Sequence, residues 1–204
     1  MKMRKPSRKA GKKSSRPQAG RKRAVSNRFA AFPGDRLRVI FTEKQIQKRV
    51  DEVASQVNRD FKGRTLHVIG ILENCFLFMG DLVRLLKVPV ICHFLKADIN
   101  DSGAGSAAIR EIVYTPQFEV TGNDVLLVDG ILQSGVTLDH LSRLMMAHKP
   151  SSFRTAVLVE KVDERKVDVV TDYVGFKTRQ KFLVGYGLGY QERYRNLPHI
   201  ASRT

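Results

Sequence analysis

The sequence has little of two features that would define its class. It contains two cysteines in 204 residues, too few for a disulfide scaffold and at no spacing that suits zinc, so we expect no metal site of that kind. It also contains no run of about 18–20 apolar residues, and we therefore expect no membrane-spanning helix and no membrane partner. Cys75 and Cys92 both lie in apolar runs, which favours small core residues in a reducing, cytoplasmic setting.

The start of the chain has no acidic residues, and the first one along the sequence is Asp35. The whole sequence has 36 Lys and Arg against 20 Asp and Glu, a net charge of +16, and twelve of the basic residues lie within residues 1–34. The remainder has 24 basic and 20 acidic residues and is only mildly basic. Residues 1–34 contain too few apolar side chains to offset their ordering entropy. We predict a disordered basic arm at 1–34 and a globular domain at 35–204.

The arm has three candidate roles. The leading interpretation is contact with the phosphates of RNA or DNA, or with a ribonucleoprotein, through a cluster of basic residues, Lys12, Lys13, Arg21, Lys22 and Arg23. A solubilising tail without a specific partner is the alternative. A mitochondrial transit peptide fits less well because the segment is rich in lysine and lacks an apolar face, and no apolar segment follows that would make it a secretory signal.

The domain alternates helical and extended patterns. Helices are predicted at 42–61, 75–86 and 137–148, the first from the spacing of Ile46, Val50, Val53 and Val57 and a capping box that begins at Thr42. Buried strands are predicted at 66–72, 88–95, 125–128 and 155–159, further extended pieces at 173–176 and 182–187, and a mobile loop at 98–106. Continuous apolar strands separated by helices indicate a parallel sheet covered on both faces, with ligands at the carboxyl ends of its strands.

One segment, 125–137, carries the clearest chemical signal. It places an acid, Asp129, at the end of a predicted strand, followed by a short loop with Ser134 and Gly135 and then by a helix that begins near Thr137. Such a loop directs backbone N–H groups and two hydroxyls at one point beside the positive end of a helix, which suits a phosphate. A simple turn with an N-cap would use the same residues.

This segment resembles the phosphoribosyl-pyrophosphate motif of type I phosphoribosyltransferases. The stretches 172–176, 181–188 and 194–198 extend the likeness, so that residues 36–200 resemble the hypoxanthine-guanine phosphoribosyltransferase family. The resemblance implies an α/β fold, a twisted and mainly parallel sheet flanked by helices with a small hood. It also implies a homo-oligomer and a magnesium-dependent reaction, in which a 6-oxopurine and phosphoribosyl pyrophosphate give a nucleotide and pyrophosphate.

Part of the family's site is present. The resemblance assigns the 5′-phosphate to Ser134, Gly135, Val136 and Thr137. It assigns the purine to three residues: Lys161 at the 6-oxo group, Phe182 stacked on the base and Leu183 at the ring edge. Without the resemblance, Lys161 would be read as a surface lysine and Phe182 as a core aromatic.

The rest of the family's site is altered. Gln133 stands where the family has an aspartate as general acid or base, and an amide cannot exchange a proton near neutral pH. Asp129 remains on the ribose and metal side, but glycine replaces a second acid at Gly130 and a metal-binding aspartate at Gly189. On the pyrophosphate side Arg195 is kept, whereas the family's Lys-Gly is replaced by Glu73 and Asn74, and the mobile loop's Ser-Tyr pair by Ile99 and Asn100.

These differences lead to three hypotheses. The first is a protein that binds GMP or IMP, has little or no transferase activity, needs no cofactor, and uses its arm on nucleic acid. The alternative is an active 6-oxopurine phosphoribosyltransferase of purine salvage, with Mg²⁺ as cofactor. The third is a subunit of a larger assembly in which the pocket is vestigial.

Overall fold

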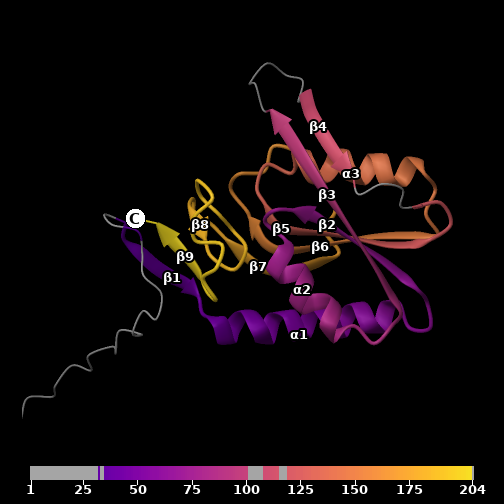
Figure 1. Ribbon diagram of the computed structural model, residues 1–204, viewed down its shortest axis with the longest axis horizontal. Helices are drawn as coiled ribbons and strands as arrows, with labels where there is room; N and C mark the ends of the chain where they lie inside the picture. Colours follow the sequence, from indigo (N-terminus) through magenta and orange to yellow (C-terminus); the bar gives the residue numbers. More distant parts are fainter. Residues whose placement is uncertain (1–31, 33–34, 101–107, 115–118, 204) are drawn as a thin grey trace, which may run out of the picture. The chain divides into compact units, whose positions relative to one another are not determined.

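The computed structural model describes residue 32 and residues 35–100, 108–114 and 119–203 (Figure 1). The predicted arm lies outside these residues except for Phe32. The chain separates into two units, 1–30 and 31–204, and the described residues all belong to the second.

The core of this unit is a six-stranded sheet with the order β4-β3-β2-β5-β6-β7. Neighbouring strands from β3 to β7 run parallel, and β4 alone pairs antiparallel with β3. This confirms the predicted type I phosphoribosyltransferase fold. The bounds are β2 (Leu66–Leu72), β3 (Val90–Asn100), β4 (Ala108–Tyr114), β5 (Asp124–Leu132), β6 (Ser152–Lys161) and β7 (Tyr173–Thr178).

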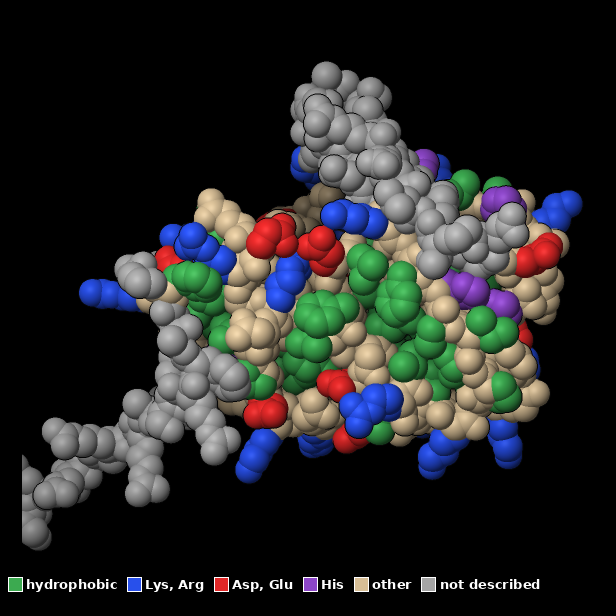
Figure 2. All heavy atoms as spheres, in the orientation of Figure 1, with side chains coloured by type: hydrophobic (Ala, Val, Ile, Leu, Met, Phe, Trp, Pro, Cys, Tyr) green, Lys and Arg blue, Asp and Glu red, His purple; other side chains and the backbone are tan. Residues whose placement is uncertain are grey.

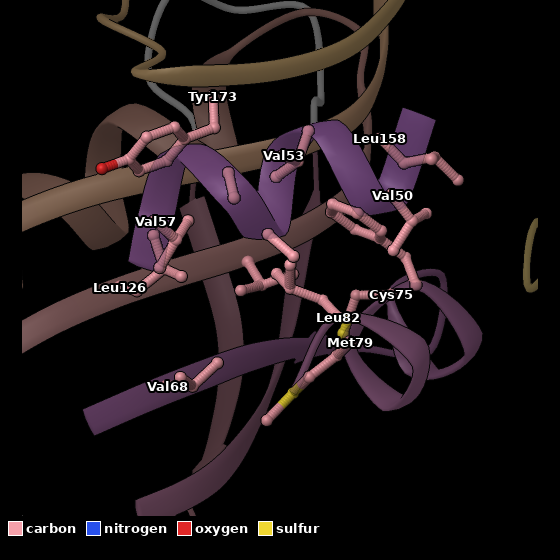
Figure 3. Close-up of a cluster of buried hydrophobic side chains, with 14 of the residues drawn as sticks. Val50, Val53, Val57, Val68, Cys75, Met79, Leu82, Leu126, Leu158 and Tyr173 are labelled. Atoms are coloured by element: carbon pink, nitrogen blue, oxygen red, sulfur yellow. The ribbon is translucent and has the colours of Figure 1, made fainter. Parts of the chain in front are cut away.

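Helices cover both faces of the sheet, as alternate residues of β5 show. Leu126 and Val128 pack in a cluster with α1 (Glu43–Asp60) and α2 (Phe76–Leu85), part of which is drawn in Figure 3. Val125 and Leu127 pack in a second cluster with α3 (Val136–Ala147). This explains why β5 is apolar without alternation. None of the helices in the described ranges is long and apolar enough to span a membrane.

The capping box predicted for α1 is present. The Gln45 backbone N–H donates to Thr42 Oγ1 at 3.4 Å, and the Thr42 backbone N–H donates to Gln45 Oε1 at 2.9 Å. The helix buries the predicted apolar stripe, Ile46, Val50, Val53 and Val57. The apolar stripe packs α1 on the sheet, and the capping box satisfies backbone N–H groups at the start of the helix.

A second, smaller sheet has the order β1-β9-β8 and is antiparallel. It joins β1 (Leu37–Phe41) to β9 (Ile200–Arg203) and β8 (Leu183–Val184), which brings together opposite ends of the domain. Leu183, Val184 and Arg203 line a cavity together with residues of β5 and β6, so this sheet lies over the carboxyl ends of the large sheet. It corresponds to the small hood that the resemblance implied.

The structure corrects four details of the sequence interpretation. The apolar segment 182–187 is a strand only at Leu183–Val184, because the chain then turns through left-handed conformations at Gly185, Tyr186 and Gly187. Residues 98–100 continue β3 by pairing with β4 and are no loop, while 101–106 lie outside the described residues. Asp129 lies inside β5, which continues to Leu132. Cys92 is exposed rather than part of the core, unlike the buried Cys75.

Candidate functional site

Two adjoining cavities open at the carboxyl ends of β5 and β6. The smaller has a volume of about 220 Å³ and is lined by the loop between β5 and α3. The larger, about 390 Å³, lies between β5, β6 and the small sheet. Asn74, Ile131 and Gln133 line both, so the two cavities share a wall. We call them the phosphate cavity and the base cavity after the ligand groups that the sequence predicts there.

Backbone hydrogen bonds from residues 166–167 hold the loop that lines the phosphate cavity. The Ser134 carbonyl accepts the backbone N–H groups of Lys166 and Val167 at 2.9 and 3.1 Å. Gly135 has φ +87°, and a Cβ there would lie 2.9 Å from the Val167 carbonyl oxygen, so this position requires glycine. The fold therefore fixes the loop through backbone contacts.

The start of α3 faces this cavity. Gly135 is the N-cap residue and has no side chain to cap the helix, so neither Ser134 nor Thr137 is the N-cap. Ser134 Oγ accepts from the Val136 N–H at a long 3.4 Å. Ser134, Gly135 and Thr137 line the cavity, whereas Val136 does not. Partly unsatisfied N–H groups and two hydroxyls beside a helix N-terminus can bind a phosphate.

Asp129 lies at the back of the phosphate cavity and is 8% exposed. Burial raises the pKa of its carboxyl group to about 7, although the backbone N–H groups of Ile131 and Gly130 oppose the shift. The Ile131 N–H donates to Asp129 Oδ1 at 3.3 Å. Near neutral pH this carboxyl group is therefore partly protonated, which lessens its repulsion of an anion in the same cavity.

The base cavity has a buried lysine and an exposed aromatic ring. Lys161 is 3% exposed, whereas Phe182 is 58% exposed. Both line the cavity together with Leu183. The reading of Lys161 as a surface lysine and of Phe182 as a core aromatic is therefore wrong. Tyr190 lies edge-on to Phe182, with ring centroids 6.3 Å apart, and adds a second apolar wall.

Glu164 belongs to this cavity and was missed by the sequence reasoning. Its carboxylate pairs with Lys161 Nζ at 3.1 and 3.2 Å and accepts from Gln133 Nε2 at 2.7 Å. Lys161 also donates to the Lys181 carbonyl oxygen. No motif marks position 164, because the residue comes into the site through the chain reversal after β6. The sequence shows only an acidic residue three positions after Lys161, and that spacing alone does not indicate a site.

Ion pairs occupy the pyrophosphate side of the site. Glu73 pairs with Arg195 Nη2 at 2.8 Å and with Lys96 Nζ at 3.1 Å. Arg195 Nη1 also donates to Asn74 Oδ1 at 2.8 Å. We call Glu73, Asn74, Lys96 and Arg195 the clamp. Arg195 holds a carboxylate of its own chain, and neither it nor Glu73 lines the two cavities.

Close packing beside three glycines holds the clamp in its position next to the two cavities. A Cβ at Gly130 would lie 2.2 Å from the Asn74 carbonyl oxygen, and one at Gly187 would lie 2.7 Å from the same atom. The loop after β2 therefore passes between two glycines. A Cβ at Gly189 would lie 2.7 Å from Arg195 Cζ, so the guanidinium occupies the space beside that position.

The described residues hold few groups that could bind magnesium by themselves. Within that part of the chain, no three or more His, Cys, Asp and Glu side chains gather where they could hold a metal ion. Asp129 is the one carboxylate among the residues that line the phosphate cavity, and its raised pKa reduces its value as a ligand for a hard cation. Magnesium in proteins is usually bound by one or two carboxylates together with the phosphates of a substrate, so Asp129 is the residue that could contribute to such a site.

Comparisons with known proteins agree on the family. The model of the family described as Phosphoribosyl transferase domain matches residues 39–191. The hypoxanthine-guanine phosphoribosyltransferase of Dictyostelium discoideum is 39% identical over 79% of this chain and 92% of its own length. That of Aquifex aeolicus is 35% identical over 82% of this chain and 94% of its own.

Solved structures lead to the same family. A crystal structure of a hypoxanthine-guanine phosphoribosyltransferase from Bacillus anthracis has a TM-score of 0.75 and 35% identity, and covers 84% of this chain and 100% of that one. A ternary substrates complex of the Trypanosoma cruzi hypoxanthine phosphoribosyltransferase has a TM-score of 0.76 and 31% identity, covering 81% and 94%. The chain described here therefore belongs to the hypoxanthine-guanine phosphoribosyltransferase family.

Proposed function

We propose that this chain binds a purine nucleoside 5′-monophosphate across its two cavities. The observation that carries the proposal is their shared wall: a loop suited to a phosphate adjoins a cavity with an exposed aromatic ring and a buried ammonium group. A nucleotide has the same order of groups, an anionic phosphate and a planar base joined by a ribose. Stacking on Phe182 and hydrogen bonds from the α3 N-terminus would hold the two ends.

The comparisons favour a second candidate, an active 6-oxopurine phosphoribosyltransferase. The relatives named above are called hypoxanthine-guanine or hypoxanthine phosphoribosyltransferases, and similarity extends over at least nine tenths of each. These findings support transfer activity over its loss. In that reaction the base would attack the ribose carbon of phosphoribosyl pyrophosphate as pyrophosphate leaves and the base gives up a proton.

The geometry of this chain argues for slow transfer. Gln133 lines both cavities, and its side-chain amide cannot accept the proton that the base loses. Glu73 neutralises Arg195 and Lys96, so these cations attract a leaving pyrophosphate less strongly. We therefore propose that binding is kept and that turnover is much slower than in the relatives.

Calorimetry with GMP and IMP tests the binding proposal. We expect binding without magnesium, because the contacts come from the phosphate loop and the base cavity. Thr137→Ala should weaken it by about 1–2 kcal/mol, roughly tenfold, the usual loss for a hydrogen bond to a charged group. A Ser142→Ala variant serves as control, since Ser142 lies on α3 outside both cavities.

Two results would reject the proposal. Absence of binding at millimolar nucleotide would leave the chain as a scaffold or subunit with a vestigial pocket. Binding that requires magnesium, together with rapid formation of IMP from hypoxanthine and phosphoribosyl pyrophosphate, would establish the active enzyme.

We also propose that the arm binds RNA or DNA, on the basis of its charge alone. If about six of its twelve basic side chains contact phosphates, the slope of log affinity against log salt should lie near −4 to −5. Deleting residues 2–28 should flatten the slope and leave nucleotide binding unchanged. Equal slopes for the full and shortened chains would show that the arm does not contribute.

A homo-oligomer remains a proposal as well. Apolar side chains gather on the face drawn in Figure 2. Such a group on a surface suits contact with another protein. Sedimentation of the protein as a monomer at micromolar concentration would contradict it. A cytoplasmic location stays an expectation from the sequence.

A further inference from the structure

The base cavity presents an ammonium group and a carboxylate side by side. Lys161 Nζ lies 3.1 and 3.2 Å from the two carboxylate oxygens of Glu164. The Lys161 side chain is 4% exposed and that of Glu164 is 31% exposed, so the carboxylate is the more open partner. Both residues line the cavity near the exposed ring of Phe182. A flat ligand on that ring would turn one edge toward a donor and an acceptor placed next to each other.

Glu164 is charged at neutral pH and keeps room for a ligand. Burial alone would raise its pKa, but hydrogen bonds from Gln133 and Lys161 bring the pKa below its ordinary value. A carboxylate has about four acceptor positions, of which Lys161 uses two and Gln133 one. Oε1 therefore has a position left, and Gln133, which is exposed, can turn away and release a second on Oε2.

We propose that Glu164 determines which purine this site accepts and that it selects guanine. The Watson–Crick edge of guanine has an acceptor, O6, followed by two donors, N1–H and the 2-amino group. Lys161 Nζ has three donors, two used on Glu164 and one on the Lys181 carbonyl oxygen, so it would exchange one of its bonds to Glu164 for O6. That exchange also frees a carboxylate position, and the Glu164 carboxylate then suits the two neighbouring donors as a bidentate partner. This inference rests on the proposed purine-nucleotide site and adds its base specificity.

Other purines match the pair less well. Hypoxanthine has O6 and N1–H but no 2-amino group, so one hydrogen bond to the carboxylate is lost. Xanthine has a carbonyl oxygen at C2, which the carboxylate repels. Adenine has an amino group at C6, a donor that would face the ammonium group. Because hydrogen bonds to a charged group are among the stronger ones, we expect GMP to bind about ten- to hundredfold more tightly than IMP, and XMP more weakly still.

Calorimetric titration of the full chain with GMP, IMP and XMP tests this specificity. The variant Glu164→Gln keeps the shape of the side chain, removes its charge and introduces an amide donor. We expect it to reduce the preference for GMP over IMP about tenfold and to strengthen XMP binding, because the amide N–H can donate to the C2 carbonyl. The ratio between nucleotides is the readout, and a general loss of stability would not change it.

Asp163→Asn is the matched control. It removes a carboxylate one residue away, which is 59% exposed, pairs with Arg179 and does not line the base cavity. It should leave the three affinities in their wild-type order. Ribose 5-phosphate, which lacks a base, should bind wild-type and Glu164→Gln protein equally well.

The outcomes separate this inference from the function on which it rests. If wild-type protein binds GMP and IMP equally, or if Glu164→Gln keeps the wild-type ratio, the specificity of Glu164 is refuted while nucleotide binding stands. If none of the nucleotides binds, the proposed function and this inference both fail.

Discussion

The phosphate side and the pyrophosphate side of the site are built from different groups. On the phosphate side the groups available to a ligand are the backbone of the β5–α3 loop and two short hydroxyl side chains, and they line an open cavity. On the pyrophosphate side they come from the long charged side chains of the clamp, which bind one another. A single substitution can therefore alter the contacts on the pyrophosphate side, whereas the backbone groups on the phosphate side depend on the fold.

The packing shows why the changes on the pyrophosphate side belong together. Gly130 allows the Asn74 carbonyl to approach, and Gly189 leaves space that the Arg195 guanidinium fills. Arg195 in turn holds Glu73. A side chain at position 130 would collide with the Asn74 backbone, whereas one at position 189 would displace the Arg195 side chain. These five residues form one arrangement, so we expect a substitution at one of them alone to have only a modest effect on pyrophosphate binding.

The first prediction concerns turnover. Supplying a general acid or base contributes about 10²–10⁴-fold in an intact site, yet we expect Gln133→Asp to raise the rate of IMP formation less than tenfold. The reason is that the clamp would still oppose pyrophosphate, and groups that act as a unit are not additive. The measurement is a steady-state assay with hypoxanthine and phosphoribosyl pyrophosphate, with Gln133→Asn as control. A gain of several hundredfold would show that the clamp is no obstacle.

The second prediction weakens the clamp itself. Glu73→Gln removes the negative charge shared by Arg195 and Lys96, so inorganic pyrophosphate should bind about tenfold more tightly, a modest gain because the groups are partly exposed to solvent. Nucleoside monophosphate affinity should change little. Competition or calorimetry with pyrophosphate measures both.

Glu192→Gln is the matched control for the clamp. Glu192 also lies near Arg195, at 3.6 Å, but its side chain is 81% exposed, and such pairs contribute little. Equal effects of the two variants would show that bulk charge, and not the clamp geometry, governs pyrophosphate binding.

The sequence predicted most of the fold because the signals were local. The apolar stripe of α1, its capping box at Thr42 and the continuous apolar run of β5 each follow from short-range patterns. Strands β1, β4 and β9 were missed. β1 and β9 pair with each other across the length of the domain, and that partner cannot be seen in either segment. The turns at Gly185 and Gly187 were likewise hidden in an apolar run that reads as a strand.

The site was predicted unevenly for the same reason. Ser134, Gly135 and Thr137 are close in sequence and appear together in the phosphate cavity. The pairing of Glu73 with Arg195 and the approach of Asn74 to Gly130 join segments that lie far apart in the chain. The resemblance predicted departures from a family pattern at these positions, and that prediction concerned each position separately. Only the three-dimensional structure shows that these residues contact one another.

The smallest expected effect is on stability, and it concerns the residue between the two sides. Asp129 has a pKa of about 7 in the folded chain against an ordinary value of 3.8. Between about pH 4 and pH 7 folding therefore takes up a proton, and the stabilising contribution of the neutral carboxyl group is lost as the pH rises through 7. The variant Asp129→Asn stays neutral and does not have this dependence.

We therefore expect the melting temperature of Asp129→Asn, relative to wild type, to rise by a few degrees between pH 5 and pH 8. Taking the difference between the two proteins at each pH cancels the titration of all other groups. Magnesium alone at pH 8 should not raise the wild-type melting temperature, because a ligand that stabilises must bind the folded state and the described residues offer no site for it. A difference that does not change with pH would show that Asp129 is ionised throughout. Stabilisation by magnesium would show that the folded chain binds this ion and would contradict the expectation.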